Sequence, residues 1–250
     1  MSRALGVLVS VIALLALPTP AGAAPWSGDD AAGDVQAVRI DPAHVCSESP
    51  VDAAVATSVD ITRITVQHRP HVLVVRLRHA GSDATDSTYL TLHVLTPSRQ
   101  LSVGAARFRP RGRWHVDVGD EPDWAPTEFD DDGDGTPDCD GWSALTEVRG
   151  CRGSAVTVAG PLLTLALPRA CLGSPPWVRI GATEGVFTDD IAAADTWGTS
   201  DLVADPNTLI YGARVGTGRV DTADTSRTLR GPVVQRTLLQ SPAGLVLPTS

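Results

Sequence analysis

Apolar and polar residues alternate along several short segments of this chain, and turn residues separate these segments. In Thr88–Thr96, Leu90, Leu92 and Val94 alternate with polar positions, as in a strand that buries one face. No long stretch keeps the period of an amphipathic helix, although Pro168–Gly173 predicts a single tight helical turn. Strands are predicted at Val35–Ile40, Asp60–His68, His71–Arg78, Thr88–Thr96, Leu101–Phe108, Arg113–Val118, Ser154–Ala159, Leu162–Leu167, Trp177–Thr183 and Thr208–Arg214.

The number and length of these segments determine the expected fold class. Roughly ten short strands with frequent turns predict an all-β protein, namely an antiparallel β-sandwich of the jelly-roll or immunoglobulin-like type. A closed barrel is the main alternative. We assign residues 24–214 to this domain. Residues 215–250, rich in Thr, Arg, Gly and Pro, form a C-terminal tail or extension.

The N-terminus has the features of a removable secretion signal. Arg3 precedes the apolar run Ala4–Leu17, and small residues lie around Ala23 at the expected cleavage position. An apolar run of about 14 residues is shorter than the roughly 20 that a membrane-spanning helix needs. We therefore expect residues 1–23 to be a signal peptide, cleaved near Ala23. The mature protein would be secreted, without a membrane span.

The formal net charge of −9 comes from one part of the chain. Residues 117–140 contain 11 acidic residues and no Arg, and the rest of the chain is nearly neutral. This concentration predicts a long acidic loop, residues 117–141, inserted in the sandwich. No basic patch with interleaved aromatic residues is present, so nucleic acid is not an expected partner.

Within this segment, residues 130–138 read DDDGDGTPD and match the D-x-D-x-D-G pattern of calcium loops. Calcium takes six to eight oxygen ligands at about 2.3–2.6 Å, and alternate aspartates let a coiled backbone aim several carboxylates at one ion. Gly135 falls at the sixth position, where the chain must turn sharply. The predicted ligands are Asp130, Asp132, Asp134, the backbone carbonyl of Thr136, and Asp138.

The loop departs from the EF-hand pattern at its end. Gly141 stands where the EF-hand has a bidentate Glu, and Pro122 and Pro126 disfavour a flanking helix. The run DDDGDGTPDCD resembles the calcium loops of thrombospondin type 3 repeats, which share the DGDGxPD core and a nearby cysteine. The resemblance implies ligand roles for Asp130, Asp132, Asp134 and Asp138, and Asp140 is the candidate for the missing carboxylate. The alternative is a solvated acidic loop without a metal.

Four cysteines remain after the signal, an even number that favours two disulfides in an exported protein. Three pairings are possible. We favour Cys151–Cys171, because two strand-like segments between them make a plausible local closure. This choice leaves Cys46–Cys139.

Two smaller acidic groups lie near the ends of the predicted sandwich. One is Asp29-Asp30 with Asp34, and the other is Asp189-Asp190 with Asp195. Small β-sandwich modules often hold a structural calcium near their termini, so a second metal site is one hypothesis. Ordinary turn aspartates are the other.

Trp124 and Trp142 bracket the acidic loop. They are candidates for a sugar-stacking platform or, alternatively, for anchors that hold the loop to the core. The chain has no G-x-S-x-G, HExxH or glycine-rich phosphate motif. No catalytic residues are therefore assigned.

The body of the chain resembles DOMON-like and carbohydrate-binding sandwich modules of exported bacterial proteins. We expect a secreted, calcium-binding, non-catalytic binding or structural module, whose partner is an extracellular glycan or a cell-surface protein. The alternative is a secreted hydrolase or a carbohydrate-binding accessory module that acts on extracellular polymers.

Overall fold

The structure is a computed structural model, and it describes only part of the chain. The described residues are 24–41, 44–50, 58–81, 89–107, 112–130, 133–187, 191–198, 210–217, 220–221, 237–240 and 246–247. The predicted signal, residues 1–23, and most of the predicted extension, residues 215–250, lie outside them. No helix among the described residues is long and apolar enough to cross a membrane.

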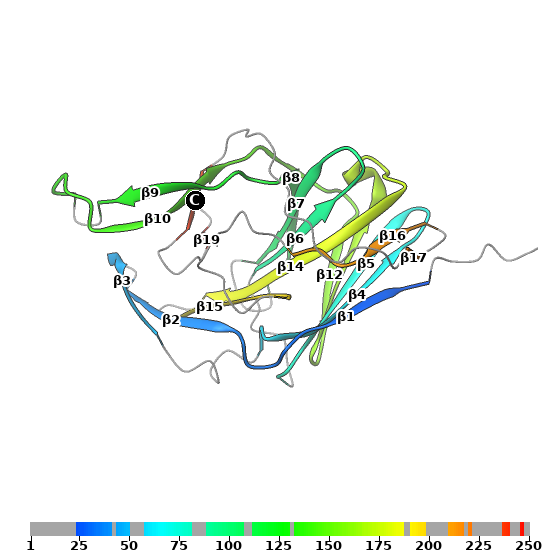
Figure 1. Ribbon diagram of the computed structural model, residues 1–250, viewed down its shortest axis with the longest axis horizontal. Coiled ribbons are helices and arrows are strands. Elements are labelled where there is room, and N and C mark those ends of the chain that lie inside the picture. The colour runs from blue at the N-terminus through cyan, green and yellow to red at the C-terminus, as the bar shows by residue number, and fades with distance from the viewer. Residues whose placement is uncertain are drawn as a thin grey trace, which may run out of the picture.

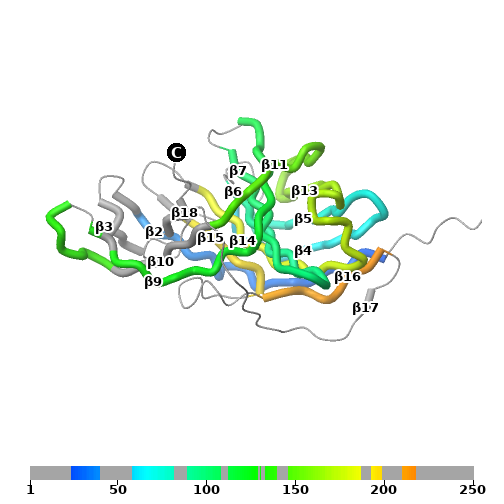
Figure 2. The backbone as a smooth tube through the Cα atoms, turned by 90° about the horizontal axis from the view of Figure 1, so that it is seen from above, coloured from blue at the N-terminus to red at the C-terminus, as the bar shows by residue number. Residues whose placement is uncertain are grey.

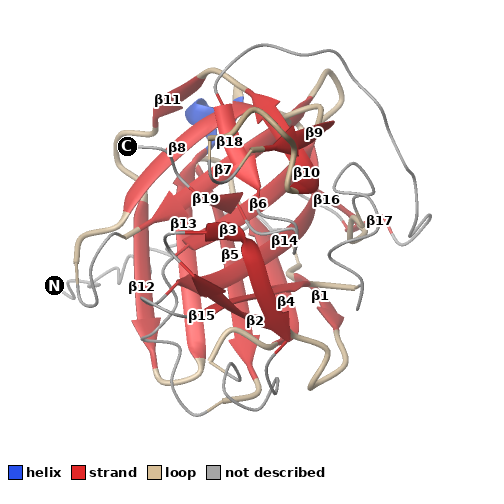
Figure 3. Ribbon diagram, turned by 90° about the vertical axis from the view of Figure 1, so that its left-hand side faces the viewer, coloured by secondary structure: helices blue, strands red, loops and turns tan. Residues whose placement is uncertain are grey.

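The described residues form an all-β protein of three antiparallel sheets, which confirms the predicted fold class (Figures 1 and 3). Sheet A consists, in order, of β1 (Trp26–Asp29), β4 (Ile61–His68), β5 (Val72–His79), β13 (Leu162–Pro168) and β12 (Ala155–Ala159). Sheet B consists of β11 (Val148–Gly150), β8 (His115–Asp120), β7 (Gln100–Ala106), β6 (Tyr89–Leu95), β14 (Trp177–Phe187), β15 (Ile191–Thr196), β2 (Gln36–Asp41) and β3 (His44–Pro50). Sheet C consists of β19 (Val246–Leu247), β18 (Thr237–Gln240), β10 (Cys139–Leu145) and β9 (Ala125–Phe129).

The two larger sheets bury their facing sides in one core. Along β5, Leu73, Val75 and Leu77 are at most 1% exposed, while Arg76 and Arg78 alternate with them on the opposite face. Leu, Ile and Val from β4, β13, β6, β7 and β14 complete the same hydrophobic cluster. The fold is thus a sandwich. Among the described residues sheet A ends at β1 and β12, so it is not part of a closed barrel.

Most predicted strands are found within a few residues of their predicted positions, and the predicted helical turn is the 3-10 helix η2 (Arg169–Leu172). The prediction at Thr208–Arg214 fails for residues 210–213, which form no strand; β16 (Arg214–Gly216) follows them and pairs with β14 and with β17 (Val220–Asp221). Gly212 instead donates its N–H to the Ile180 carbonyl at 2.9 Å. Residues 210–216 therefore lie alongside the first part of β14, before the residues of that strand that pair with β15.

The acidic segment forms a hairpin and is not a continuous loop. β9 and β10 pair in antiparallel register, with Phe129 opposite Cys139, and residues 130–138 connect them. This hairpin lies toward the same side of the molecule as β2 and β3 (Figures 1 and 2). β18, from the predicted extension, pairs with β10.

Cys151 and Cys171 form a disulfide, as predicted, with their Cα atoms 5.7 Å apart. The bond connects the end of β11 to η2. Cys139 is disulfide-bonded as well. Its predicted partner Cys46 lies on β3, and the side chain of Cys46 is outside the described part of the structure.

Candidate metal centre

Three aspartates from distant parts of the chain converge at one end of the sandwich. Asp34 lies between β1 and β2, Asp60 directly precedes β4, and Asp195 lies on β15. One carboxylate oxygen from each lies within 4.8 Å of the others. Among the described residues, this is the group of three His, Cys, Asp or Glu side chains whose ligand atoms lie that close together. Because β4 belongs to sheet A and β15 to sheet B, the cluster joins the two sheets.

In Asp60 and Asp195, one carboxylate oxygen accepts a hydrogen bond and the other does not. Asp60 Oδ2 accepts a hydrogen bond from the Gly33 N–H at 2.7 Å, and Asp195 Oδ2 accepts one from the Ile61 N–H at 2.6 Å. The Oδ1 atoms of Asp34, Asp60 and Asp195 are buried, without a hydrogen-bond partner among the described residues. Buried polar atoms are normally paired. The three free oxygens are therefore the feature of the cluster that needs an explanation.

The local sequence explains why Asp34 reaches the cluster. Residues 32–33 form a turn after β1, and Gly33 has a φ of +87°, a conformation that favours glycine. Asp30, at the start of this turn, accepts hydrogen bonds from the Ala31 N–H at 3.0 Å and the Gly198 N–H at 2.6 Å. The Asp30 carboxylate thereby connects the turn to the residues that follow β15.

Burial dominates the electrostatics of the cluster. Asp60 and Asp195 are each 1% exposed. The pKa of Asp195 is raised to about 8, mainly by burial and also by the neighbouring carboxylates, while the Ile61 N–H opposes the rise. Burial also raises the pKa of Asp30 and of Asp34. Without a cation, ionising this cluster costs free energy, because like charges repel strongly when they are shielded from water.

A buried ion pair lies beside the aspartates. Glu184 on β14 is directly opposite Asp195 in the strand register, and its Oε2 lies 2.8 Å from His79 Nε2, with both side chains fully buried. His79 Nδ1 lies 3.1 Å from the Pro161 carbonyl and must donate to it, because a carbonyl can only accept. Burial lowers the pKa of His79, but the Glu184 carboxylate, with smaller contributions from the Pro161 carbonyl and Asp60, raises it by more, so the net shift is upward.

The donor set indicates which ion the cluster would hold. The three converging groups are carboxylates, and hard oxygen ligands suit calcium or magnesium better than zinc or copper. A cation would pair the three free Oδ1 atoms and offset the repulsion among the carboxylates. The residues present therefore fit a hard divalent cation. The remaining ligands would be backbone oxygens or water.

The described residues of the predicted calcium loop do not form such a cluster. The Asp130 carboxylate accepts hydrogen bonds from the Gly133 N–H at 2.7 Å and the Gly135 N–H at 2.8 Å, and Asp134 accepts one from the Thr136 N–H at 2.7 Å. Asp130, Asp134, Thr136 and Asp138 are exposed. Asp132 and the side chain of Asp140 lie outside the described part of the structure. The prediction of a cation at this loop therefore stays a prediction.

The two tryptophans that bracket the loop differ in what is described. Trp124 is buried, 9% exposed, as expected for a residue that anchors the segment to the core. The side chain of Trp142, on β10, lies outside the described residues. The buried position of Trp124 leaves little of its ring available for stacking on a ligand.

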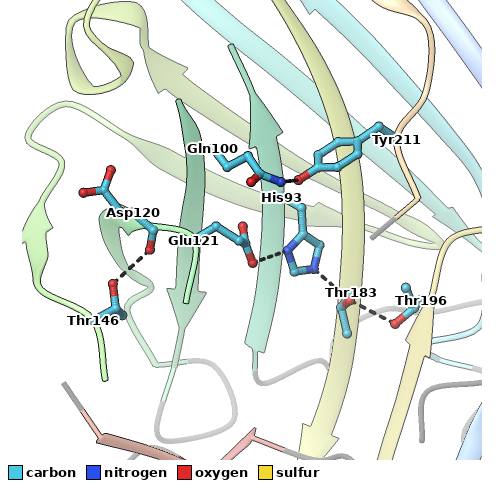
Figure 4. A network of polar contacts seen from close by, with 8 residues as sticks. All are labelled: His93, Gln100, Asp120, Glu121, Thr146, Thr183, Thr196 and Tyr211. Carbon is cyan, nitrogen blue, oxygen red and sulfur yellow. Dashed lines mark hydrogen bonds and ion pairs between the residues drawn. The ribbon is translucent and has the colours of Figure 1, made fainter. Parts of the chain in front are cut away.

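A second polar network includes His93 on β6, which lies on the face of that strand opposite its core residues Leu92 and Val94 (Figure 4). His93 Nδ1 lies 2.8 Å from Glu121 Oε1, and His93 Nε2 lies 3.2 Å from Thr183 Oγ1. Thr183 Oγ1 in turn lies 2.9 Å from Thr196 Oγ1. Nearby, Gln100 donates to the Tyr211 hydroxyl at 3.2 Å. The His93 network links strands of sheet B, and the separate Gln100–Tyr211 pair links β7 to residue 211; Glu121 Oε2 is buried without a hydrogen-bond partner among the described residues.

Sequence reasoning found two of the three clustered aspartates. Asp34 and Asp195 belong to the smaller acidic groups that were considered for a second metal site. Asp60 was read only as the first residue of a strand. Its position before a strand that reaches the same end of the sandwich is the signal that could have identified it. Comparisons with protein-family models, with curated proteins and with solved structures found no match for this chain.

Proposed function

We propose that this chain is an exported, calcium-binding β-sandwich module with a binding or structural role, and that one calcium ion occupies the cluster of Asp34, Asp60 and Asp195. The observation that carries the proposal is the convergence of three carboxylates, each of which has a buried Oδ1 atom without a partner among the described residues. Calcium is favoured over magnesium because it accepts irregular, carboxylate-rich coordination, whereas magnesium keeps a strict octahedron and several waters.

The ion would act as a clamp between the sheets. Asp60 begins a strand of sheet A, Asp195 lies on a strand of sheet B, and Asp34 lies in the connection between β1 and β2. Because the unfolded chain cannot hold these residues together, the binding free energy adds to the stability of the fold. A buried, enclosed position suits a permanent structural ion better than a reversible signal.

The acidic hairpin is proposed as a second, weaker calcium site. Its ligands would be Asp130, Asp132, Asp134, Thr136 and Asp138, with Asp140 as the further carboxylate. Gly133 and Gly135 have φ values of +78° and +87°, so the backbone already turns as a coiled loop would. The described carboxylates are exposed, so affinity at this position should be lower than at the buried cluster.

Export to an oxidising compartment is part of the same proposal. The Cys151–Cys171 disulfide supports it, since disulfides persist mainly outside the cytosol. The extracellular setting also supplies calcium at concentrations that suit weak structural sites. The partner would be an extracellular glycan or a cell-surface protein.

Thermal melting in calcium and in chelator tests the two sites separately. In wild type, calcium at 100 times the dissociation constant of the buried cluster should add about 2.7 kcal/mol of stability from that site, and less from the weaker hairpin site. Asp60→Asn keeps an oxygen that can accept from Gly33 but removes the charge, and should abolish the larger share of the calcium gain. Asp134→Asn is the matched variant in the hairpin and should remove only the smaller share.

Three outcomes distinguish the sites. If wild type melts identically in calcium and in chelator, both sites are contradicted. An Asp60→Asn variant with the full wild-type gain contradicts the buried cluster alone. An Asp134→Asn variant that loses most of the gain would move the principal site to the hairpin.

A further inference from the structure

One row of polar residues crosses the outer face of sheet A, which also carries apolar residues such as Val74 and Leu162. In the strand register, one row of residues crosses all five strands: Ser27 on β1, Thr65 on β4, Arg76 on β5, Thr164 on β13 and Thr157 on β12. Side chains in register share a face, so these five form one row across the whole sheet. Four steps of about 4.8 Å between strands give the row a length of roughly 19 Å.

This row consists of hydroxyl groups around one guanidinium. Ser27 Oγ and Thr65 Oγ1 lie 3.0 Å apart at an exposed position. Thr157 is exposed, and Thr164 and Arg76 are partly exposed. The intervening residues of the same strands, such as Ile64 and Leu165, are fully buried in the core. The row therefore lies on the solvent-facing side of sheet A.

The same face is basic, although the chain as a whole carries a net charge of −9. Next to the row, Asp29, Arg63 and Arg78 lie opposite one another on β1, β4 and β5. Arg63 pairs with Asp29 at 2.5 Å, and these side chains remain 53% and 71% exposed. Among the described residues, no carboxylate forms an ion pair with Arg76 or Arg78. The face thus offers two guanidinium groups, two residues apart on β5, that no carboxylate of the described part of the chain neutralises.

The chemistry of this face indicates which class of anionic partner fits it. Guanidinium groups bind carboxylates in a bidentate manner, and the flanking hydroxyl groups can exchange hydrogen bonds with sugar hydroxyls. Single-stranded nucleic acid would need aromatic side chains for base stacking, and the outward-facing residues of this register include none. A membrane surface would need exposed apolar residues. Among the described residues, the exposed large hydrophobic residue is Val148, which lies on β11 in sheet B and not on this face.

We propose that the outer face of sheet A binds an acidic polysaccharide, with Arg76 and Arg78 contacting its carboxylates and the row from Ser27 to Thr157 contacting its hydroxyl groups. The bound polysaccharide would run along the row, across the five strands of sheet A. Nothing in this proposal depends on the calcium cluster, which lies among buried residues and uses carboxylates as ligands.

Binding of soluble hyaluronan to the immobilised full chain tests the proposal, with neutral dextran as the matched polymer without charge. Wild type should bind hyaluronan at low salt and release it as salt screens the guanidinium groups. Arg76→Gln with Arg78→Gln should weaken binding at least tenfold. Arg113→Gln with Arg152→Gln removes the same charge from exposed positions elsewhere, and should change binding less than twofold.

A second pair of substitutions separates sugar recognition from simple charge attraction. Thr65→Val with Thr164→Val keeps the shape of the strands and removes two hydroxyl groups of the row. It should weaken hyaluronan binding several-fold and leave the melting temperature near that of wild type. The proposal is overturned if wild type binds hyaluronan no better than dextran, or if the two arginine pairs behave alike. It is equally overturned if duplex DNA binds as tightly as hyaluronan and the threonine pair has no effect.

Discussion

Asp195→Asn is expected to make the metal-free protein more stable at pH 8, which is the opposite of what loss of a structural hydrogen-bonding residue would do. The folded-state pKa of Asp195 is about 8, against 3.8 for an ordinary aspartate. Each pKa unit corresponds to about 1.4 kcal/mol, so the burial of this carboxylate destabilises the metal-free fold at pH 8 by on the order of 5 kcal/mol. Asparagine removes that cost and can still accept from the Ile61 N–H.

The sign of the pH dependence follows from the same shift. Between pH 4 and pH 8 the unfolded chain has released the Asp195 proton while the folded protein retains it. Stability of the metal-free wild type should therefore fall as the pH rises through this interval, and the Asp195→Asn variant should show a smaller fall. Below pH 8, calcium must displace the proton, so its apparent affinity should rise up to tenfold per pH unit.

Urea unfolding at pH 5 and pH 8, with chelator and with calcium, checks these expectations. Calcium should stabilise wild type more at pH 8 than at pH 5, and should stabilise Asp195→Asn little at either pH. If the variant is less stable than metal-free wild type at pH 8, burial of the Asp195 carboxylate does not destabilise the metal-free fold. If the variant keeps the full calcium effect, this carboxylate is not a calcium ligand.

His79→Leu is expected to destabilise the fold by about 3–5 kcal/mol, because it leaves the buried Glu184 carboxylate without its partner. Both side chains are fully buried and lie 2.8 Å apart, so water cannot replace the lost interaction. The double variant His79→Leu with Glu184→Leu removes both charges. It should recover most of the loss, since buried ion pairs are often no more stabilising than apolar residues of similar volume.

Equilibrium unfolding of the two single variants and the double variant measures the coupling between these residues. The interaction free energy should be several kcal/mol, because each single variant strands one buried polar group. A double variant that is as unstable as the sum of the singles would show that the two side chains act independently, contrary to the short contact between them.

The sandwich could be predicted from sequence because alternating apolar positions recur in its central strands, as in β6 and β13. β5 and β13 place branched apolar residues inward at every second position, so both the strand and its buried face are visible in the sequence. β15 was missed because its sequence, IAAADT, has little alternation of apolar and polar residues. β1, with the sequence WSGD, is too short to show a period. Tertiary pairing, and not local preference, forms these strands.

The candidate metal centre shows where local sequence stops being informative. Asp34 and Asp195 stood in acidic groups that resembled ordinary turns, and Asp60 stood apart from both groups, as the first residue of a predicted strand. Asp195 lies 134 residues from the Ile61 N–H to which it bonds, and only the pairing of β15 with β14 and β2 brings it to Asp34. Which oxygens lack partners depends on that geometry. The strongest acidic motif in the sequence, by contrast, lies on an exposed hairpin.

Anomalous diffraction from a crystal grown in calcium tests the central claim most directly. We expect one strong peak enclosed by the Oδ1 atoms of Asp34, Asp60 and Asp195, at the 2.3–2.6 Å that is typical of calcium–oxygen bonds. That peak should be absent in Asp60→Asn crystals grown under the same conditions. A map without a peak at this position, in a crystal whose three carboxylates are ordered, would contradict the account.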